Sequence, residues 1–266
     1  MKGGDSIEKD VKIYVVTHKQ YDITQNDIYK PLFVGAANKE TYGYLRDDVG
    51  DNISEKNQDY SEFTGLYWIW KNSQADIVGL NHYRRVFANG YLGRGKLLEK
   101  EQILHALENH DVIVYKKKKL AKTLYENFRI HVTKEDMNIA RDAFHKFYPE
   151  YSDTYDEVLN DREMYAYSLF ISSKEWLDDY CEFLFKFLFY LEEALYNANN
   201  LKNKRVIGYI AEILLYVYIK HFKFKTKEFY IKFLDAKSSN LANLINDSQI
   251  FAYIYYYIYL KQKMID

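Results

Sequence analysis

Residues 76–85, Asp-Ile-Val-Gly-Leu-Asn-His-Tyr-Arg-Arg, decide the expected fold of this chain. The apolar residues at 77–80, with Gly79 among them, predict a short central strand. Its carboxyl end, where open α/β sheets bind ligands, carries Asn81, His82, Tyr83, Arg84 and Arg85. Adjacent arginines there suit phosphate, because a guanidinium keeps its charge and can donate two parallel hydrogen bonds. The alternative is that they lie on the surface and pair with carboxylates elsewhere.

Strand-like and helix-like patterns alternate on both sides of this stretch. We expect strands at residues 11–17, 32–34, 111–115 and 164–172. Helical patterns begin at Asp59 and cover residues 99–108, 135–147, 174–197 and 205–220. This order predicts an α/β fold with a mixed, mainly parallel sheet flanked by helices, followed by a helical carboxyl-terminal region.

The composition of the 266 residues excludes several classes of protein. With 48% hydrophobic and 18% aromatic residues the chain is expected to fold, and its single cysteine cannot form an internal disulfide. The formal net charge of -1 gives no general electrostatic basis for binding nucleic acid. Neither a signal peptide nor a membrane-spanning run is expected. These features predict a cytoplasmic protein without a nucleic-acid partner.

Polar and cationic residues gather where the predicted strands end and in the loop at residues 43–58. The sequence has no dinucleotide fingerprint, phosphate loop, metalloprotease motif or nucleophile elbow. The cluster suits an anionic, hydroxyl-rich ligand such as a nucleotide sugar. Its members are Thr17, His18, Lys19, Asn52, Ser54, Asn57, Glu62, His82, Arg84 and Arg85.

Two carboxylates have alternative explanations in this sequence. Glu62 follows Asp59 by three residues, so it can cap the helix that begins there. In the helix at 205–220, Glu212 shares a face with Arg205 and Gly208, apart from the apolar face. A buried ion pair with an arginine is the structural alternative to a catalytic role for Glu212.

The last residues of the chain are rich in tyrosine and isoleucine. Residues 236–266 are expected to form an aromatic helical extension, with residues 1–235 as the main domain. Such a helix followed by Lys261 and Lys263 suits a membrane interface. Packing on its own domain or on a partner is the alternative, so peripheral contact with the inner face of the cell membrane stays open.

Several motifs in one order resemble a bacterial glycosyltransferase family. They are Thr17-His18-Lys19, Val34-Gly35-Ala36-Ala37-Asn38, Gly50-Asp51-Asn52-Ile53-Ser54-x-Lys56-Asn57, Ser61-Glu62-x-Thr64-Gly65-Leu66-Tyr67-Trp68-Ile69-Trp70-Lys71, Gly79-Leu80-Asn81-His82-Tyr83-Arg84-Arg85 and Arg205-Val-x-Gly208-Tyr209-x-Ala211-Glu212. The resemblance covers about residues 11–220. Members of that family act in capsular and exopolysaccharide synthesis, were long known only as a domain of unknown function, and include galactosyl- and galactofuranosyltransferases.

The resemblance implies a GT-A-like fold and transfer of a hexose from a UDP-sugar donor to a surface-glycan, lipid-linked or glycoprotein acceptor. The donor-binding residues would be Thr17, His18, Lys19, Asn52, Ser54, Asn57, Asn81, His82, Tyr83, Arg84, Arg85 and Arg205. An inverting mechanism needs a base for the acceptor hydroxyl. Glu212 is the first candidate for this base and Glu62 is the second.

Some features depart from the pattern of the family. Many GT-A enzymes carry an Asp-x-Asp metal motif where this chain has Asn81-His82-Tyr83. Either Mn²⁺ or Mg²⁺ held by other groups, or Arg84 and Arg85 directly, would stabilise the departing diphosphate, and we favour the arginines. Ser168-Leu-Phe-Ile stands where Asn-Met-Phe-Ile is expected, and Ile213 where arginine is usual. The alternatives are another nucleotide-sugar enzyme, or a catalytically inactive glycan-binding or assembly subunit.

Overall fold

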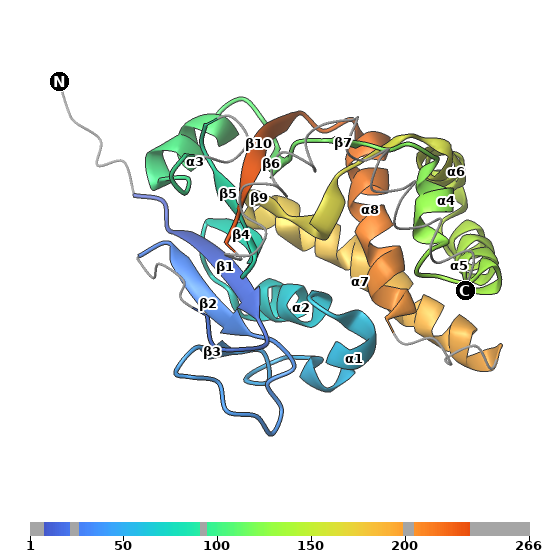
Figure 1. Cartoon of the computed structure of the whole chain (residues 1–266), viewed down its shortest axis with the longest axis horizontal. Coiled ribbons are helices and arrows are strands. Elements are labelled where there is room, and N and C mark those ends of the chain that lie inside the picture. Colours follow the sequence, from blue (N-terminus) through green and yellow to red (C-terminus); the bar gives the residue numbers. More distant parts are fainter. Residues whose placement is uncertain (1–7, 22–26, 91–94, 199–204, 235–266) are drawn as a thin grey trace.

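Strand β4 (Ile77–His82) is the centre of the computed structural model, which describes residues 8–21, 27–90, 95–198 and 205–234 (Figure 1). It lies between β1 (Val11–Thr17), which runs parallel to it, and β9 (Phe170–Ser173), which runs antiparallel. Apolar side chains on β4 are buried, which confirms the strand predicted at residues 77–80. The strand continues to His82 because the β1 ladder pairs as far as Val16 and His82.

The amino-terminal part of the sheet is parallel. Its order is β3-β2-β1-β4, with β2 at Tyr29–Phe33 and β3 at Leu45–Arg46. The predicted strand at 32–34 therefore begins three residues earlier and ends at Phe33. Pro31 is tolerated inside β2 because β3 pairs only with Leu32 and Phe33, so the ladder does not need a proline N–H.

The rest of the sheet is mixed and returns to β4. It contains β5 (Arg85–Ala88), β10 (Thr226–Phe233) and β6 (Val112–Tyr115), and the pairings run β4–β9–β6–β10–β5–β4. Strands β5 and β9 are antiparallel to their neighbours. The expected mainly parallel character thus holds for the amino-terminal part, whereas the rest of the sheet combines the parallel β6–β10 pair with antiparallel pairs. The chain passes from β4 into β5 through the two residues Tyr83 and Arg84.

Helices cover the sheet and form a group beside it (Figure 1). Helix α2 packs beside α7 under the sheet, α3 packs on β6 and β9, and α5, α6 and α8 are grouped with α7. The helical bounds are α1 Asn57–Tyr60, α2 Phe63–Asn72, α3 Lys100–Leu107, α4 Leu124–Phe128, α5 Lys134–Phe147, α6 Ser152–Asn160, α7 Lys174–Asn197 and α8 Val206–Phe222. Short elements are η1 Ser54–Lys56, η3 Pro149–Tyr151, η4 Ala166–Ser168, β7 Lys118–Lys119 and β8 Glu163–Met164. The four helices predicted from residue 99 onward are confirmed within two residues.

Two expectations about the helices are wrong. The helix expected from Asp59 is divided into α1 and α2 by Ser61, whose φ is 53°, and Glu62 makes no side-chain cap on α2. Helix α8 is buried on nearly all sides rather than on one face, because other helices and the α1–α2 turn surround it. Glu212, half-buried on α8, therefore lies among packed elements and not on an outer surface.

Residues 236–266 lie outside the described residues, so the expected aromatic extension stays a prediction. Among the described residues, no helix is both long enough and apolar enough to cross a membrane.

Gly79 lies at the centre of the sheet, where the neighbouring side chains leave no room for a Cβ atom. A Cβ atom at this position would lie 2.7 Å from Cδ1 of Ile13 and 2.8 Å from Cγ1 of Ile171. We expect Gly79→Ala to lower the free energy of unfolding by about 1–3 kcal/mol, measured by urea denaturation. Adding Ile13→Val, which removes that Cδ1, should recover part of the loss. Purely additive losses would contradict this account of the packing.

Candidate active site

The turn between β4 and β5 is anchored before its arginines begin. The N–H of Tyr83 donates to the carbonyl of Val16 at 3.0 Å, and the Tyr83 ring is buried. The rings of His18 and Tyr21 approach the Tyr83 ring edge to face, with centroids 5.3 and 5.2 Å away. Leu234 donates its N–H to the carbonyl of Arg84. The two arginines therefore extend from a fixed backbone.

Arg84 and Arg85 are half-buried and leave hydrogen-bond donors unused. The Nε atoms of both are buried and have no hydrogen-bond partner within the described residues. The Cζ of Arg85 lies 3.9 Å from the centre of the Tyr167 ring, and that of Arg84 lies 5.3 Å from the Tyr83 ring. Aromatic faces hold the cations without using their N–H groups. Buried guanidinium donors in this state are suited to an anionic ligand.

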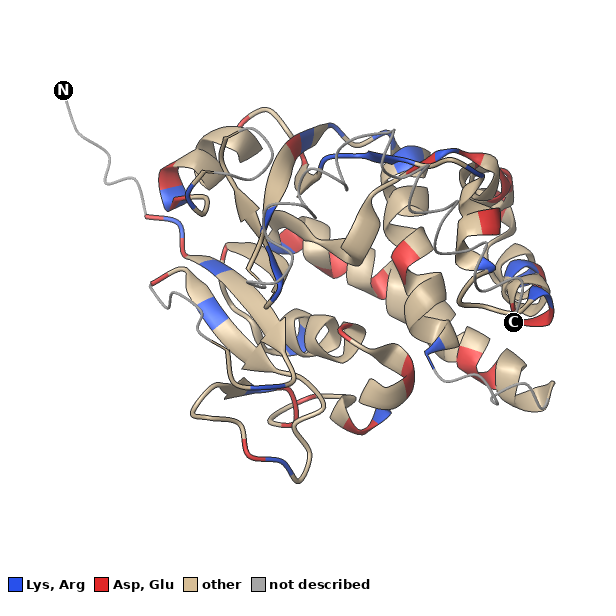
Figure 2. Cartoon of the chain, in the orientation of Figure 1, with Lys and Arg blue, Asp and Glu red and all other residues tan. Residues whose placement is uncertain are grey.

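Glu62 and Glu212 bring two carboxyl groups close to these arginines. Burial raises the pKa of Glu212 to about 8, helped by the nearby Glu62 and opposed chiefly by Arg85. Burial also raises the pKa of Glu62, which Arg205, Arg85 and Arg84 oppose. Figure 2 shows the same arrangement as positive charge at the β4–β5 turn, with negative charge on α8 and before α2. With its pKa at about 8, Glu212 therefore binds a proton near neutral pH.

Two histidines contribute neutral imidazoles rather than charges. Burial and the neighbouring Arg85 and Arg84 lower the pKa of His82 to about 3. Its Nδ1 accepts the N–H of Arg84 at 3.2 Å, which fixes the ring. Partial desolvation and nearby cations, first Lys19 and then Arg84, lower the pKa of His18, although much of this residue stays open to solvent. Positive charge at this site thus comes from the arginines and Lys19.

Arg205 enters the site from the start of α8. Its φ of 73° is left-handed, and its Nε donates to Oγ of Ser61 at 3.1 Å. Gly208, one turn later, lets the α1–α2 turn approach, since a Cβ there would lie 3.2 Å from the same Oγ. This contact brings Arg205 beside Glu62, which follows Ser61. The structure therefore brings the charged groups of Glu62, Glu212, Arg84, Arg85 and Arg205 close to His18 and His82, and their role in one site stays a prediction.

Most of the other predicted donor-binding residues form hydrogen bonds within the chain, and Asn81 is the exception among the described residues. Thr17 is buried, and its Oγ1 donates to the carbonyl of Lys19 at 2.7 Å. Asn52 accepts the N–H of Ser54 at 3.1 Å, and Asn57 donates to Thr64 at 2.9 Å. Asn81 is fully buried, yet both atoms of its amide are unpartnered within the described residues. Donor contacts by these residues stay predictions.

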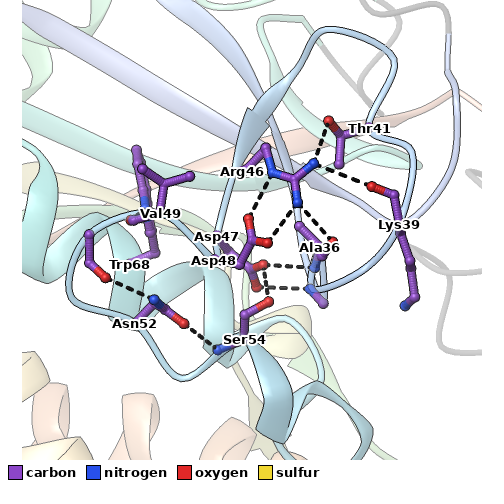
Figure 3. Close-up of polar contacts among 12 residues, drawn as sticks. Ala36, Lys39, Thr41, Arg46, Asp47, Asp48, Val49, Asn52, Ser54 and Trp68 are labelled. Carbon is purple, nitrogen blue, oxygen red and sulfur yellow. Dashed lines mark hydrogen bonds and ion pairs between the residues drawn. The ribbon is translucent and has the colours of Figure 1, made fainter.

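Asp47 supports the loop that carries Asn52, Ser54 and Asn57. Its fully buried carboxylate accepts the N–H groups of Gly35 and Ala36 at 2.8 and 3.0 Å. It also accepts the hydroxyl of Ser54 at 2.5 Å (Figure 3). The hydroxyl of Thr64 donates to the same carboxylate at 2.7 Å. Next to it, Asp48 pairs with the half-buried Arg46. Asp47 lies in a polar loop without strand or helix periodicity, so no sequence pattern predicted that its carboxylate is buried and accepts four hydrogen bonds.

Tyr167 is a site residue that the sequence did not indicate. The strand expected at 164–172 is interrupted by η4, where Tyr167 and Ser168 have φ of 71° and 49°. A backbone hydrogen bond from Tyr167 lowers the pKa of Glu212 against the effect of burial. Neither residue is a glycine or asparagine, which would have signalled left-handed backbone.

The residues present do not fit a divalent cation. Among the described residues, no group of three or more histidine, cysteine, aspartate or glutamate side chains could hold a metal ion. Glu62 and Glu212 lie instead among three guanidinium groups, whose charge would repel a cation.

Comparison with known proteins agrees with this architecture. The family described as "Domain of unknown function (DUF4422)" matches residues 12–224. The solved apo structure of WbbM, a bifunctional glycosyltransferase, superimposes with a TM-score of 0.74 and 33% sequence identity. That match covers 85% of this chain but 46% of WbbM, so the chain spans less than half the length of its neighbour. No curated protein sequence matches.

Substituting Asp47 and Asp48 one at a time tests whether Asp47 stabilises the loop. Asp47→Ala leaves four buried donors without their acceptor, so we expect it to lower the free energy of unfolding by about 3 kcal/mol or more. Asp48→Ala removes a partly exposed ion pair and should cost at most about 1 kcal/mol. Chemical denaturation measures both, and equal losses would show that Asp47 is not the hub of the loop.

Proposed function

This chain belongs to the family described as a domain of unknown function (DUF4422), and from that premise we propose that it is a glycosyltransferase. We infer that it transfers a hexose, with galactose in pyranose or furanose form as the first candidate, from a UDP-sugar. The acceptor is a surface glycan, a lipid-linked glycan or a glycoprotein. Support comes from the 33% identity to WbbM and from the chemistry of the candidate site.

One observation carries the proposal, namely a surplus of positive charge at the β4–β5 corner. Three guanidinium groups act on two carboxyl groups there, and the pKa of Glu212, raised to about 8, limits the negative charge of that carboxyl near neutral pH. The Nε–H groups of Arg84 and Arg85 have no acceptor among the described residues. A diphosphate supplies both the missing charge and the missing acceptors.

The same groups suit both halves of the transfer reaction. As the bond from the sugar to the diphosphate breaks, Arg84 and Arg85 stabilise the charge that develops on the leaving UDP. In an inverting transfer, Glu212 accepts the proton of the acceptor hydroxyl, which attacks the anomeric carbon. Glu62 keeps the pKa of Glu212 high, and Arg205 orients the carboxylates or the phosphates. Glu62 is the second candidate for the base.

Thermal-shift measurements with a panel of nucleotide sugars test the class of donor. We expect UDP-hexoses to raise the melting temperature, because a ligand that binds only the folded state stabilises it. The shift should be the same with and without Mn²⁺. If no UDP-sugar shifts the melting temperature, or if the shift requires Mn²⁺, the proposed binding mode is wrong.

Removing either arginine should weaken UDP binding. Each charged hydrogen bond is worth about 1.5–3 kcal/mol, so Arg84→Ala and Arg85→Ala should each raise the Kd roughly 10- to 150-fold. Isothermal titration calorimetry measures this change. Arg141→Ala is the matched control, because Arg141 pairs with Asp156 in the α5–α6 region. Undiminished binding in both site variants would remove the assigned phosphate contacts.

The pH dependence of turnover tests the base. Because burial raises the pKa of Glu212 to about 8, its ionised form is lost below that pH, and turnover should rise with pH through this range. Glu212→Gln should bind UDP but lose about 10²- to 10⁴-fold in kcat, together with that rise. Glu62→Gln removes the neighbouring charge, so the rise should move to lower pH.

UDP release from the donor, followed across pH, distinguishes the outcomes. Unchanged turnover in Glu212→Gln would assign the base to another group. Donor binding without turnover in the unaltered protein would favour the inactive glycan-binding or assembly subunit.

A further inference from the structure

Two consecutive left-handed residues interrupt the expected strand beside the candidate site. Tyr167 has φ of 71° and ψ of 7°, and Ser168 has φ of 49°. This backbone conformation is unfavourable for residues with a Cβ, and it persists where the surrounding structure enforces it, commonly at functional sites. The hydroxyl of Ser168 is buried without a hydrogen-bond partner among the described residues. Both features indicate that the turn serves a purpose other than local stability.

The turn places Tyr167 between two groups of the site. The centre of its ring lies 3.9 Å from Cζ of Arg85, which is the shortest of the arginine–ring distances in the described chain. Its backbone lowers the pKa of Glu212 against the effect of burial. Its ring stacks on that of the buried Tyr115, at a centroid distance of 5.9 Å and an interplanar angle of 17°. Continuing the extended strand would break this arrangement.

We propose that Tyr167 is a positioning residue that holds the Arg85 guanidinium in place for the donor diphosphate. This inference rests on the proposed function, because it assigns a purpose to Arg85 there. An arginine side chain has many rotamers, and fixing it before the ligand arrives removes an entropic cost from binding. The ring does so by stacking, and it leaves the N–H donors of Arg85 available. Tyr167 itself contacts no reacting atom in this scheme.

A double-mutant cycle measures whether Tyr167 acts through Arg85. Tyr167→Leu should raise the Kd for UDP about tenfold, while Tyr167→Phe, which keeps the ring, should bind like the unaltered protein. Tyr167→Leu combined with Arg85→Ala should bind no more weakly than Arg85→Ala alone. Equal weakening by Leu and Phe, or additive losses in the double variant, would overturn the proposal.

Glycine substitutions distinguish the contribution of the Tyr167 ring from that of its left-handed backbone conformation. Tyr167→Gly adopts a positive φ without strain, so the fold should keep its melting temperature while UDP affinity falls as in Tyr167→Leu. Tyr42→Gly is the matched control, because Tyr42 also has a positive φ of 56° but lies in the loop before β3. It should leave UDP affinity unchanged. A Tyr167→Gly protein that is folded and binds UDP normally would contradict the role of the ring.

Nuclear magnetic resonance tests the position of Arg85 without any ligand. Stacking on Tyr167 should shift the Hε signal of Arg85 upfield by the ring current, and the signal is assigned by its loss in Arg85→Lys. The shift should persist in Tyr167→Phe and disappear in Tyr167→Leu. If the unaltered protein binds no UDP, the proposed function fails, whereas an Arg85 signal without a ring-current shift overturns the positioning role itself.

Discussion

The balance of charge at the β4–β5 corner governs the candidate site. Removing carboxylates and guanidinium groups from water is costly unless each finds a partner. Here burial raises the pKa of both Glu62 and Glu212, and because that of Glu212 reaches about 8, the two carboxyl groups do not balance the three arginines near neutral pH. Arg84 and Arg85 form no ion pair within the described residues. A fold that keeps such groups half-buried gains stability when an anion arrives.

The topology of the sheet explains why these groups meet. Strand β4 belongs to both the parallel part and the closed ring, and its only pair with β5 is His82 with Arg85. The chain must therefore turn sharply at Tyr83 and Arg84, next to the end of β1. Helix α8 and the α1–α2 turn approach the same corner, with Gly208 permitting their contact. Groups distant in sequence thus meet at one edge of the sheet.

The sequence predicted the parts of this site that depend on periodicity and strand ends. Strand β4, helix α8 and the arginines at 84 and 85 follow from apolar patterns and their abrupt end. Strands β5 and β10 were missed, because β5 follows β4 after a two-residue turn and Lys227, Glu228 and Lys232 obscure the pattern of β10. The true setting of Glu62 depends on Ser61, a non-glycine residue with positive φ. No local pattern encodes such a conformation, because tertiary contacts impose it.

Residues with strained backbone conformations lie close to the charged groups of the candidate site. The described chain has seven non-glycine residues with positive φ, and four of them, Ser61, Tyr167, Ser168 and Arg205, surround the candidate site. Three of them carry, adjoin or contact a charged group, since Arg205 is itself a cation, Ser61 precedes Glu62 and accepts from Arg205, and the ring of Tyr167 lies on Arg85. Strain of this kind persists only where packing elsewhere compensates for it. The large aromatic core around α7 and α8 provides that compensation, so the stability of the helical part sustains the conformation of the site.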